Sequence, residues 1–205
     1  MTNKVIIANS SHATKVENLR RIAYHNSTGF TVKNEQEFES YCQWNKKDET
    51  GIVLLIMNEQ GKAISCLRSN VYFDDIQHET NNSSFAGCTE NFIQYPALDM
   101  TFAATLPEYF KSGLLSVLRY YMYLLHRHSV KSITGQVVKE STLFFTLQNL
   151  GYDFKEIDKT RQDLEALNKW TLANLDNQKF DNAIQILKTK YKDTINQFPL
   201  ILTIN

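Results

Sequence analysis

The chain has 205 residues, of which 42% are hydrophobic and 12% are aromatic, enough apolar mass for the core of one domain. Its 22 Lys and Arg residues equal its 22 Asp and Glu residues, so the chain as a whole has no net attraction to nucleic acid or to an anionic membrane. The longest apolar run, residues 52–57, is far shorter than the roughly 20 residues of a membrane span, and the first apolar stretch is too short for a signal peptide, so we expect a cytoplasmic protein.

The N-terminal segment predicts a strand followed by two helices. An apolar run over residues 5–9 predicts the strand. Ser10 and Ser11 then supply capping hydroxyls for a helix in which apolar residues recur at helical spacing from residue 16 to 23. A second amphipathic helix is expected over residues 34–44.

The clearest hairpin in the sequence follows. Apolar segments 51–58 and 63–72 are joined by a turn with a glycine, where a positive φ costs little. The segment 74–95 is polar and long for a connection inside a compact domain, and it is interpreted either as a mobile lid or as plain surface. The next strand is expected over residues 98–105, and strand alternation places four of its residues on one face. These four are Asp99, Thr101, Ala103 and Thr105.

The order from residue 98 onward is strand, helix, strand, helix, strand. A strong helix with an apolar stripe begins after Gly113 and closes at residues 126–128, and a strand follows over 130–138. A helix over residues 140–151 is stopped by a glycine, and residues 152–157 resume a strand.

The last part of the chain predicts two helices and a strand. Leu164, Leu167 and Trp170 mark one helix, and a longer apolar stripe from Phe180 to Ile195 marks a better one. The apolar segment 198–204 is expected to be a strand buried in a sheet. We therefore divide the single domain into a core over residues 1–157 and a helical insertion with the final strand over residues 158–205.

Two stretches resemble the core of the GNAT (Gcn5-related N-acetyltransferase) superfamily. Residues 99–118, read as DMTFAATLPEYFKSGLLSVL, are similar to the family's fourth strand, its Pro-Glu-Tyr turn and the glycine-bearing loop that opens its long helix. Residues 141–152, read as STLFFTLQNLGY, are similar to the later helix ending in Leu-Gly-Phe. The resemblance covers most of residues 5–157. It implies an α/β (α+β) fold around a mixed, mostly antiparallel sheet flanked by helices, with the C-terminal helical insertion before the last strand.

Shorter motifs resemble one branch of that superfamily. Leu67-Arg68 at the end of the third strand, Asp99-x-Thr101 and the helix segment 19–24 are similar to the pattern of acyl-homoserine-lactone synthases and N-acyl amino acid synthases. This resemblance implies transfer of an acyl group from a thioester donor to a small primary amine such as an amino acid. The donor would be acyl-CoA or an acyl carrier protein, and no metal is implied.

The glycine-bearing loop is the expected donor site. A helix N-terminus has unpaired amides and a partial positive charge, so it binds phosphate, either the pyrophosphate of CoA or the single phosphate of a carrier-bound phosphopantetheine. The expected donor-binding residues are Thr105, Lys111, Ser112, Gly113, Leu114 and Leu115. The alternative is that Gly113 is only a helix-entry residue.

The chain departs from the family pattern at three positions. Phe110 and Leu115 stand where the family has Gln or Arg and Gly or Ala, so a tight grip on pyrophosphate is in doubt. Leu147 replaces a Tyr that protonates the departing thiolate in many members, although a thiol with a pKa near 8.5 leaves without a proton donor. These changes favour a carrier-bound donor or the alternative function, a non-catalytic GNAT-fold protein that binds a ligand or partner.

The resemblance also implies a catalytic set. The backbone amides of Ala103 and Ala104 are the candidates for the oxyanion, and Asp99 is the candidate carboxylate for the amine, with a salt-bridged structural role as its alternative. Arg68 either pairs with Asp99, clamps a substrate carboxylate, or is an ordinary strand-edge arginine in solvent. Thr101 and Tyr24 are expected beside the amine, with an ordinary core position as the alternative for Tyr24.

The remaining candidate groups predict no metal site. Cys42, Cys66 and Cys88 are widely spaced and are interpreted as buried thiols in a reducing compartment. His126 and His128 are expected to cap a helix as cations rather than to bind a metal. Basic residues near the donor loop either meet an acidic carrier protein or are solvated helix charges, and the balanced charge gives little support to a nucleic-acid-binding module. These basic residues are Lys111, Arg119, Arg127 and Lys131.

Overall fold

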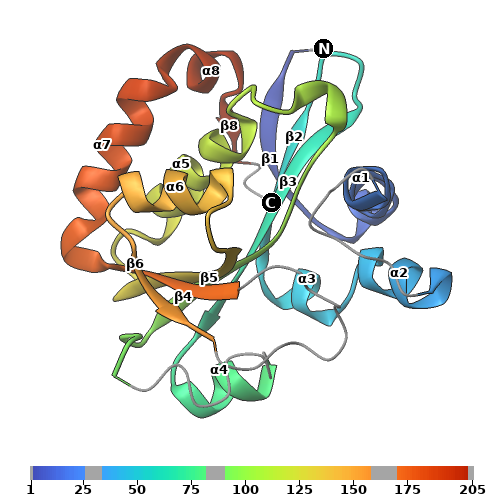
Figure 1. Ribbon diagram of the computed structural model, residues 1–205. Coiled ribbons are helices and arrows are strands. Elements are labelled where there is room, and N and C mark those ends of the chain that lie inside the picture. Colours follow the sequence, from blue (N-terminus) through green and yellow to red (C-terminus); the bar gives the residue numbers. More distant parts are fainter. Residues whose placement is uncertain (1, 26–33, 82–90, 158–169, 203–205) are drawn as a thin grey trace.

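A computed structural model describes residues 2–25, 34–81, 91–157 and 170–202 (Figure 1). One eight-stranded sheet runs through the molecule in the order β6-β7-β5-β4-β3-β2-β1-β8. The strands are β1 Lys4–Ala8, β2 Ile52–Met57, β3 Ala63–Tyr72, β4 Ala97–Thr105, β5 Ser132–Val138, β6 Asp153–Glu156, β7 Trp170–Asp176 and β8 Leu200–Ile201. The helices are α1 Ala13–His25, α2 Glu35–Cys42, α3 Lys46–Thr50, α4 Asp75–Asn81, α5 Leu114–His126, α6 Thr142–Asn149, α7 Phe180–Lys190 and α8 Lys192–Gln197.

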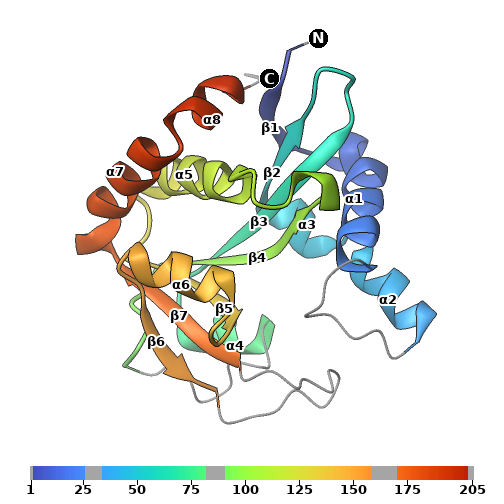
Figure 2. The same ribbon diagram turned by 45° about the horizontal axis from the view of Figure 1, so that its top comes forward.

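Helices cover both faces of the sheet. Helices α1 to α3 lie on one side, and α5, α6 and α7 lie on the other (Figures 1 and 2). Because both faces are covered, β2 and β3 are buried along almost their whole length. β2 is a continuous apolar run, whereas β3 also buries the polar residues Ser65, Arg68, Ser69 and Asn70. No helix of the described residues has both the length and the apolar composition that crossing a membrane requires.

The first four strands confirm the sequence prediction in outline. Strands β1 to β4 pair antiparallel in chain order, and the hairpin turn places Gly61 at a φ of +74°. The cap of the first helical segment differs from the prediction. The side chain of Asn9, not of Ser10 or Ser11, accepts the capping hydrogen bond from the Ser11 N–H at 3.1 Å, because a 3₁₀ turn precedes α1.

A β-bulge interrupts β4. Cys66 pairs with Ala104 and Arg68 with Thr101, so two residues of β4 oppose one of β3, and Phe102 has a φ of +52°. The prediction that Thr105 shares a face with Thr101 is therefore wrong. The hydroxyl of Thr105 lies 2.8 Å from that of Ser65, on the face that α5 covers, because the bulge shifts the alternation by one residue.

The segment after β6 corrects a predicted helix. Residues 164–169 lie outside the described residues, and Trp170 begins strand β7, which pairs antiparallel with both β5 and β6. Residues 171–175 are all buried, so the strand lacks the period-two alternation that identifies a half-buried strand. Residues 158–205 thus contribute a central strand of the sheet as well as helices.

The C-terminal elements differ from the prediction in two respects. The single helix expected from Phe180 to Ile195 is two helices, α7 and α8, separated at Tyr191. The final strand is not buried. Up to residue 202, where the description ends, only Leu200 and Ile201 pair, in parallel with β1, and Ile201 is 46% exposed because β8 is an edge strand.

The polar connection after β3 begins with an anchored helix. His78 of α4 is buried, its ring stacks on that of Tyr72 at 4.5 Å, and its Nδ1 lies 3.1 Å from the Tyr95 hydroxyl. These contacts fix α4 to the sheet. Residues 82–90, the centre of the predicted lid or surface segment, lie outside the described residues.

Candidate active site

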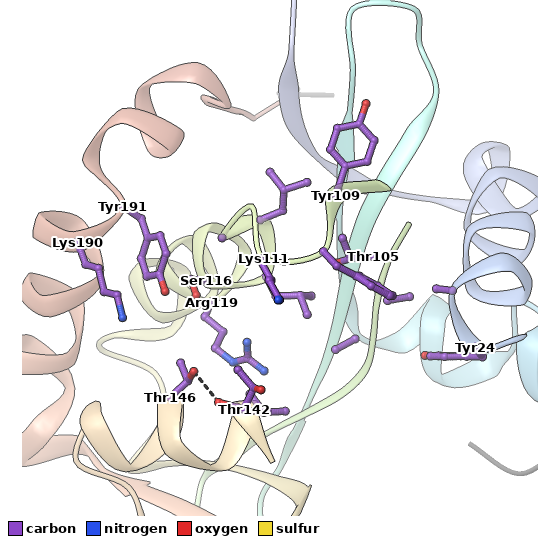
Figure 3. Close-up of a pocket in the computed structure, with 18 residues that line it drawn as sticks. Tyr24, Thr105, Tyr109, Lys111, Ser116, Arg119, Thr142, Thr146, Lys190 and Tyr191 are labelled. Atoms are coloured by element: carbon purple, nitrogen blue, oxygen red, sulfur yellow. Dashed lines mark hydrogen bonds between the residues drawn. The ribbon is translucent and has the colours of Figure 1, made fainter. Parts of the chain in front are cut away.

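A pocket of about 530 Å³ lies beside the end of β4 (Figure 3). Its walls come from α1, β4, the loop before α5 with the first turns of α5, α6, and the α7–α8 junction. The lining residues are Ala23, Tyr24, Ala103, Ala104, Thr105, Tyr109, Phe110, Lys111, Gly113, Leu114, Leu115, Ser116, Arg119, Thr142, Leu143, Thr146, Lys190 and Tyr191. Three of these are cations and none is Asp or Glu, so the described lining favours an anionic ligand.

Strands β4 and β5 separate at the pocket. Their parallel pairing covers only residues 97–99 of β4 and 132–134 of β5, yet β4 continues to Thr105 and β5 to Val138. The backbone of residues 100–105 therefore has no partner in β5. The bulge at Phe102 lies in this segment, which pairs only with β3, and Ala103 and Ala104 follow it in the pocket wall. Bulges commonly redirect backbone groups beside active sites.

The N-terminus of α5 forms another wall of the pocket. Gly113 is the N-cap residue, and no side chain caps the helix. The N–H groups of Ser116 and Val117 donate to the carbonyl oxygen of Gly113. Within the described residues, the N–H groups of Leu114 and Leu115 donate to no acceptor. Two unpaired amides and the positive end of the helix dipole thus face the pocket.

Glycine is required at position 113 for two reasons. Its φ of +83° belongs to the left-handed region, which L side chains rarely adopt. A Cβ atom there would also lie 2.7 Å from two ring carbons of Tyr191. Tyr191, from the α7–α8 junction, therefore packs directly on the helix N-terminus.

Tyr24 of α1 lies at the opposite side of the pocket from α6 and α7 (Figure 3). Its ring centroid is 5.7 Å from that of Tyr41 on α2. Withdrawal from water raises the pKa of Tyr24 well above its ordinary value, so the phenol stays protonated.

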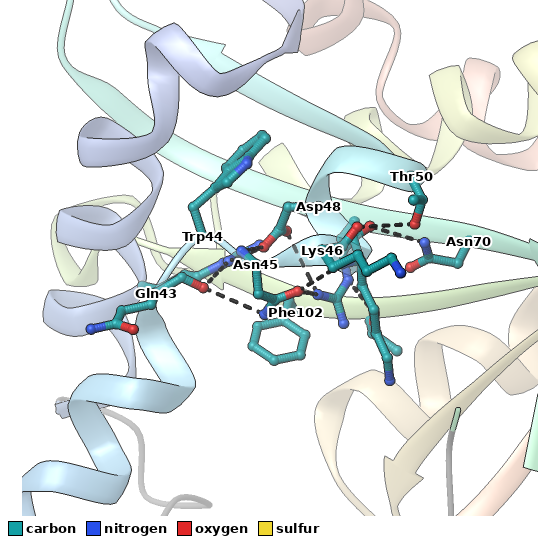
Figure 4. Close-up of polar contacts among 12 residues, drawn as sticks. Gln43, Trp44, Asn45, Lys46, Asp48, Thr50, Asn70 and Phe102 are labelled. Carbon is teal, nitrogen blue, oxygen red and sulfur yellow. Dashed lines mark hydrogen bonds and ion pairs between the residues drawn. The ribbon is translucent and has the colours of Figure 1, made fainter. Parts of the chain in front are cut away.

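A buried polar network lies on the face of the sheet that α1 covers, and it links α1, α3, β3 and β4 (Figure 4). Arg20 donates two hydrogen bonds to Asp48, at 2.5 and 3.1 Å. Arg68 lies in the middle of β3 and is 2% exposed; its Nε donates to the Thr101 hydroxyl at 3.0 Å, and its Nη1 lies 3.6 Å from an Asp48 oxygen. The guanidinium of Arg68 stands 4.0 Å from the centroid of the Phe102 ring.

Arg68 is therefore neither at the end of its strand nor in solvent, and the prediction of a strand-edge arginine is wrong. Burial lowers the pKa of Arg68, and the charge of Asp48 opposes that shift. Its ion-pair partner is Asp48 rather than Asp99. Asp99 is 1% exposed and pairs with Asn70 on β3 and Thr134 on β5.

Comparisons with known proteins decide the fold. No protein-family model matches the sequence, and no curated protein matches it. An acetyltransferase of the GNAT family from Streptococcus pneumoniae superposes with a TM-score of 0.54 at 15% identity, over 85% of this chain and 98% of that one. The chain has the GNAT fold.

Other solved structures with the GNAT fold agree. The ribosomal-protein-S5-alanine acetyltransferase from Vibrio fischeri gives a TM-score of 0.57 at 15% identity, over 86% of this chain and 94% of that one. The CoA-dependent acyl-homoserine lactone synthase MesI gives 0.58 at 12% identity, over 92% of this chain and 95% of that one. The GNAT-like fold expected from residues 99–118 and 141–152 is thus confirmed.

Most of the site residues expected from the GNAT resemblance line the pocket. They are Tyr24, Ala103, Ala104, Thr105, Lys111, Gly113, Leu114 and Leu115. Ser112 does not line it, and its hydroxyl donates to the Tyr109 carbonyl at 2.6 Å. Asp99, Thr101 and Arg68 are also outside the lining. Leu147 is buried in α6 and likewise outside it.

Sequence reasoning missed the contribution of the α7–α8 junction. Lys190 and Tyr191 line the pocket, although more than seventy residues separate them from Gly113 along the chain. No motif marks them. The sequence marked Arg119 only as a basic residue near the donor loop, and its burial in the pocket wall depends on the packing of α7 on α5.

Cys42, Cys66 and His126 are buried in the protein interior. Burial raises the pKa of Cys42 to about 11 and also raises that of Cys66, so both stay protonated; Cys88 lies outside the described residues. Burial lowers the pKa of His126, which disfavours the cationic form expected of a helix cap, and its Nδ1 lies 3.3 Å from the Ser129 hydroxyl. Among the described residues, no group of three His, Cys, Asp or Glu side chains could hold a metal ion.

Proposed function

We propose that the protein is an N-acyltransferase that moves an acyl group from a CoA thioester to a small primary amine, such as an amino acid. The observation that carries the proposal is the pairing of two features in one pocket. The unpaired amides of Leu114 and Leu115 offer an anion site, and the end of β4, which pairs with β3 but not with β5, lies beside them. A ligand with phosphate at one end and a thioester carbonyl at the other fits both.

The donor end of the proposal follows from the α5 N-terminus. The pyrophosphate of CoA accepts hydrogen bonds from the amides of Leu114 and Leu115, next to Gly113. Lys111 adds a positive charge from the same loop. Thr105, the last residue of β4, also lines the pocket. Phe110 is 50% exposed and adds no polar contact.

The chemistry is direct attack of the amine on the thioester carbonyl. The backbone amide of Ala103, in the pocket wall, stabilises the oxyanion that forms as the amine nitrogen bonds to the carbonyl carbon. The backbone of Ala104, the other candidate, is paired with Cys66 and interacts with its thiol. Ser65, buried beneath Ala103 and Ala104, holds the Ala104 carbonyl through a hydrogen bond of 3.1 Å and so limits rotation of that peptide. The nitrogen of the intermediate loses a proton to water, and collapse of the oxyanion expels the CoA thiolate, which leaves without a proton donor because its conjugate thiol is acidic enough.

The amine approaches from the side of Tyr24. The described lining residues include no carboxylate, so the amine enters as the free base or loses its proton to water in the pocket. Thr101 and Arg68 support β4 from beneath and keep the bulge at Phe102 in place. Because Asp99 is buried and outside the pocket lining, we assign it support of that strand rather than contact with the amine.

A donor and acceptor panel tests the proposal. Thiol release is measured with acyl-CoA thioesters of short and long chain, and with the same acyl groups on acyl carrier protein, against amino acids and other primary amines. Turnover of at least one CoA pair is expected. If the folded protein consumes no thioester in any combination, the proposed function is wrong.

The second candidate is a GNAT-fold protein that binds its ligand without turnover. Phe110, Leu115 and Leu147 favour it, because they stand where the family carries functional groups. Binding of acyl-CoA with no acyl transfer to any amine would support this candidate. The same panel, combined with a binding measurement, therefore separates the two functions.

A further inference from the structure

Arg119 is a buried cation without a counter-charge. It lies on the second turn of α5, is 5% exposed, and lines the pocket, where its guanidinium is directed between α5 and α6 (Figure 3). Its Nε has no hydrogen-bond partner, and no carboxylate of the described residues lies within 4.0 Å of it. A buried charge without a partner is costly, so its presence indicates a ligand that supplies one.

The two phenols whose pKa values respond to the charge of Arg119, those of Tyr123 and Tyr152, are neutral. Tyr123 and Tyr152 share a hydrogen bond of 2.6 Å between their hydroxyls. Burial raises the pKa of Tyr123 to about 12 and that of Tyr152 well above its ordinary value, while Arg119 acts in the opposite direction on both. Neither phenol is therefore the missing anion.

The α7–α8 junction brings a second cation to the same pocket. Lys190 lines it, and its Nζ is 5.5 Å from the centroid of the Tyr191 ring. Tyr191 in turn packs on Gly113 at the N-terminus of α5. The ring thus holds the junction, and Lys190 with it, against the expected phosphate site.

We propose that Arg119 and Lys190, positioned by Tyr191, form an anion subsite that binds phosphate groups of the nucleotide end of CoA and so selects free CoA thioesters over carrier-bound phosphopantetheine. This inference rests on the proposed function. The subsite adds side-chain charge where Phe110 provides none. CoA carries a diphosphate and a phosphate monoester of charge about −1.5 to −2, more negative charge than the single phosphodiester on a carrier protein.

Affinity measurements test the subsite directly. Titration calorimetry of the full chain compares CoA, dephospho-CoA and pantetheine 4′-phosphate. We expect Arg119→Met to weaken CoA binding by about 10- to 100-fold, the effect of one charge-assisted contact. Lys190→Met, at an exposed side chain, is expected to weaken it by about 3- to 10-fold, less at high salt. Both variants should reduce the preference for CoA over pantetheine 4′-phosphate.

Lys188→Met is the matched control. Lys188 is on the same helix and carries the same charge, but it is exposed and outside the pocket lining. Its CoA affinity should stay within about twofold of wild type. A second readout separates a ligand-binding role from a structural one. Without ligand, Arg119→Met should melt at or above the wild-type temperature, because the substitution removes an uncompensated charge.

The outcomes are distinguishable. CoA affinity unchanged in both Arg119→Met and Lys190→Met would overturn the subsite and leave the proposed function standing. If Arg119→Met does not fold, the CoA affinities of Lys190→Met and Lys188→Met are compared instead. Equal affinities in these two variants would overturn the subsite. A wild-type chain that binds neither CoA nor acyl-CoA would overturn the donor assignment itself.

Discussion

Asp99 of β4 and Thr134 of β5 are the last residue pair of the parallel ladder between these strands. Beyond them the strands diverge, and the next residue of β5, Gly135, approaches so closely that a Cβ atom would lie 3.0 Å from the Met100 carbonyl oxygen. The opening of the sheet therefore begins at a tightly packed point. This geometry exposes the backbone of β4 to the pocket without loosening the strand itself.

Gly113→Ala should lower both stability and donor affinity. The φ of +83° costs an alanine about 1 to 2 kcal/mol, and the new Cβ would collide with Tyr191. Gly151→Ala is the matched control, because it has a φ of +89° but its nearest atoms are 3.7 Å away. Urea unfolding should show a larger loss for Gly113→Ala, and calorimetry should show weaker CoA binding only there. Equal losses in the two variants would contradict the contact with Tyr191.

Asp99→Asn tests whether this carboxylate takes a proton from the amine. Since Asp99 is 1% exposed and outside the pocket lining, we expect kcat at saturating amine to fall by less than about threefold. Loss of a direct general base costs about 100- to 10,000-fold. Steady-state kinetics on a variant shown by circular dichroism to be folded makes the measurement. A fall in the larger range would restore Asp99 as the base.

Asp48→Asn should be severely destabilising. It removes the charge that Arg20 and Arg68 share in the interior, and breaking a buried pair costs about 3 to 5 kcal/mol. Glu39→Gln is the control, because its ion pair with Arg21 is about one-third exposed and such pairs contribute about 0 to 1 kcal/mol. Denaturant unfolding of both variants gives the comparison. If the two variants lose similar free energies of unfolding, the buried ion pairs of Asp48 stabilise the fold no more than the partly exposed pair of Glu39.

His78 should make stability depend on pH. Burial lowers its pKa to about 4 from an ordinary value of 6.5, so the unfolded chain binds the proton more readily than the folded one. The stability that comes from keeping His78 neutral is fully present above pH 6.5 and is lost as the pH falls toward 4. The free energy of unfolding should therefore fall by about 2 kcal/mol between pH 7 and pH 5. Urea unfolding of wild type and of His78→Phe at pH 7 and at pH 5 measures the share of this fall that is due to His78. His128→Gln, at an exposed position, should retain the wild-type dependence.

The sequence predicted those parts of the site whose signals are local. The hairpin around Gly61 and the loop at Gly113 are marked by turn chemistry within a few residues, and both were placed correctly. The face of Thr105 was predicted wrongly, because the bulge at Phe102 depends on pairing with β3. Strand β7 was missed since burial on both faces removes its alternation.

The role of the C-terminal helices had no local signal at all. Tyr191 reaches Gly113 only because α7 packs on α5, a contact between segments remote in sequence. The burial of Arg119 has the same origin. Amphipathic spacing indicated that α7 would dock, but not which of its residues would face the pocket.

The break at Tyr191 also connects the pocket to the far edge of the sheet. The residues after Tyr191 form α8 and then β8, which hydrogen-bonds to β1, and the Tyr121 hydroxyl of α5 donates to the Phe198 carbonyl at 3.1 Å. A ligand that holds Lys190 in place would thereby slow fraying of β8. Amide hydrogen exchange at Leu200 and Ile201, remote from the pocket, should report its occupancy as increased protection.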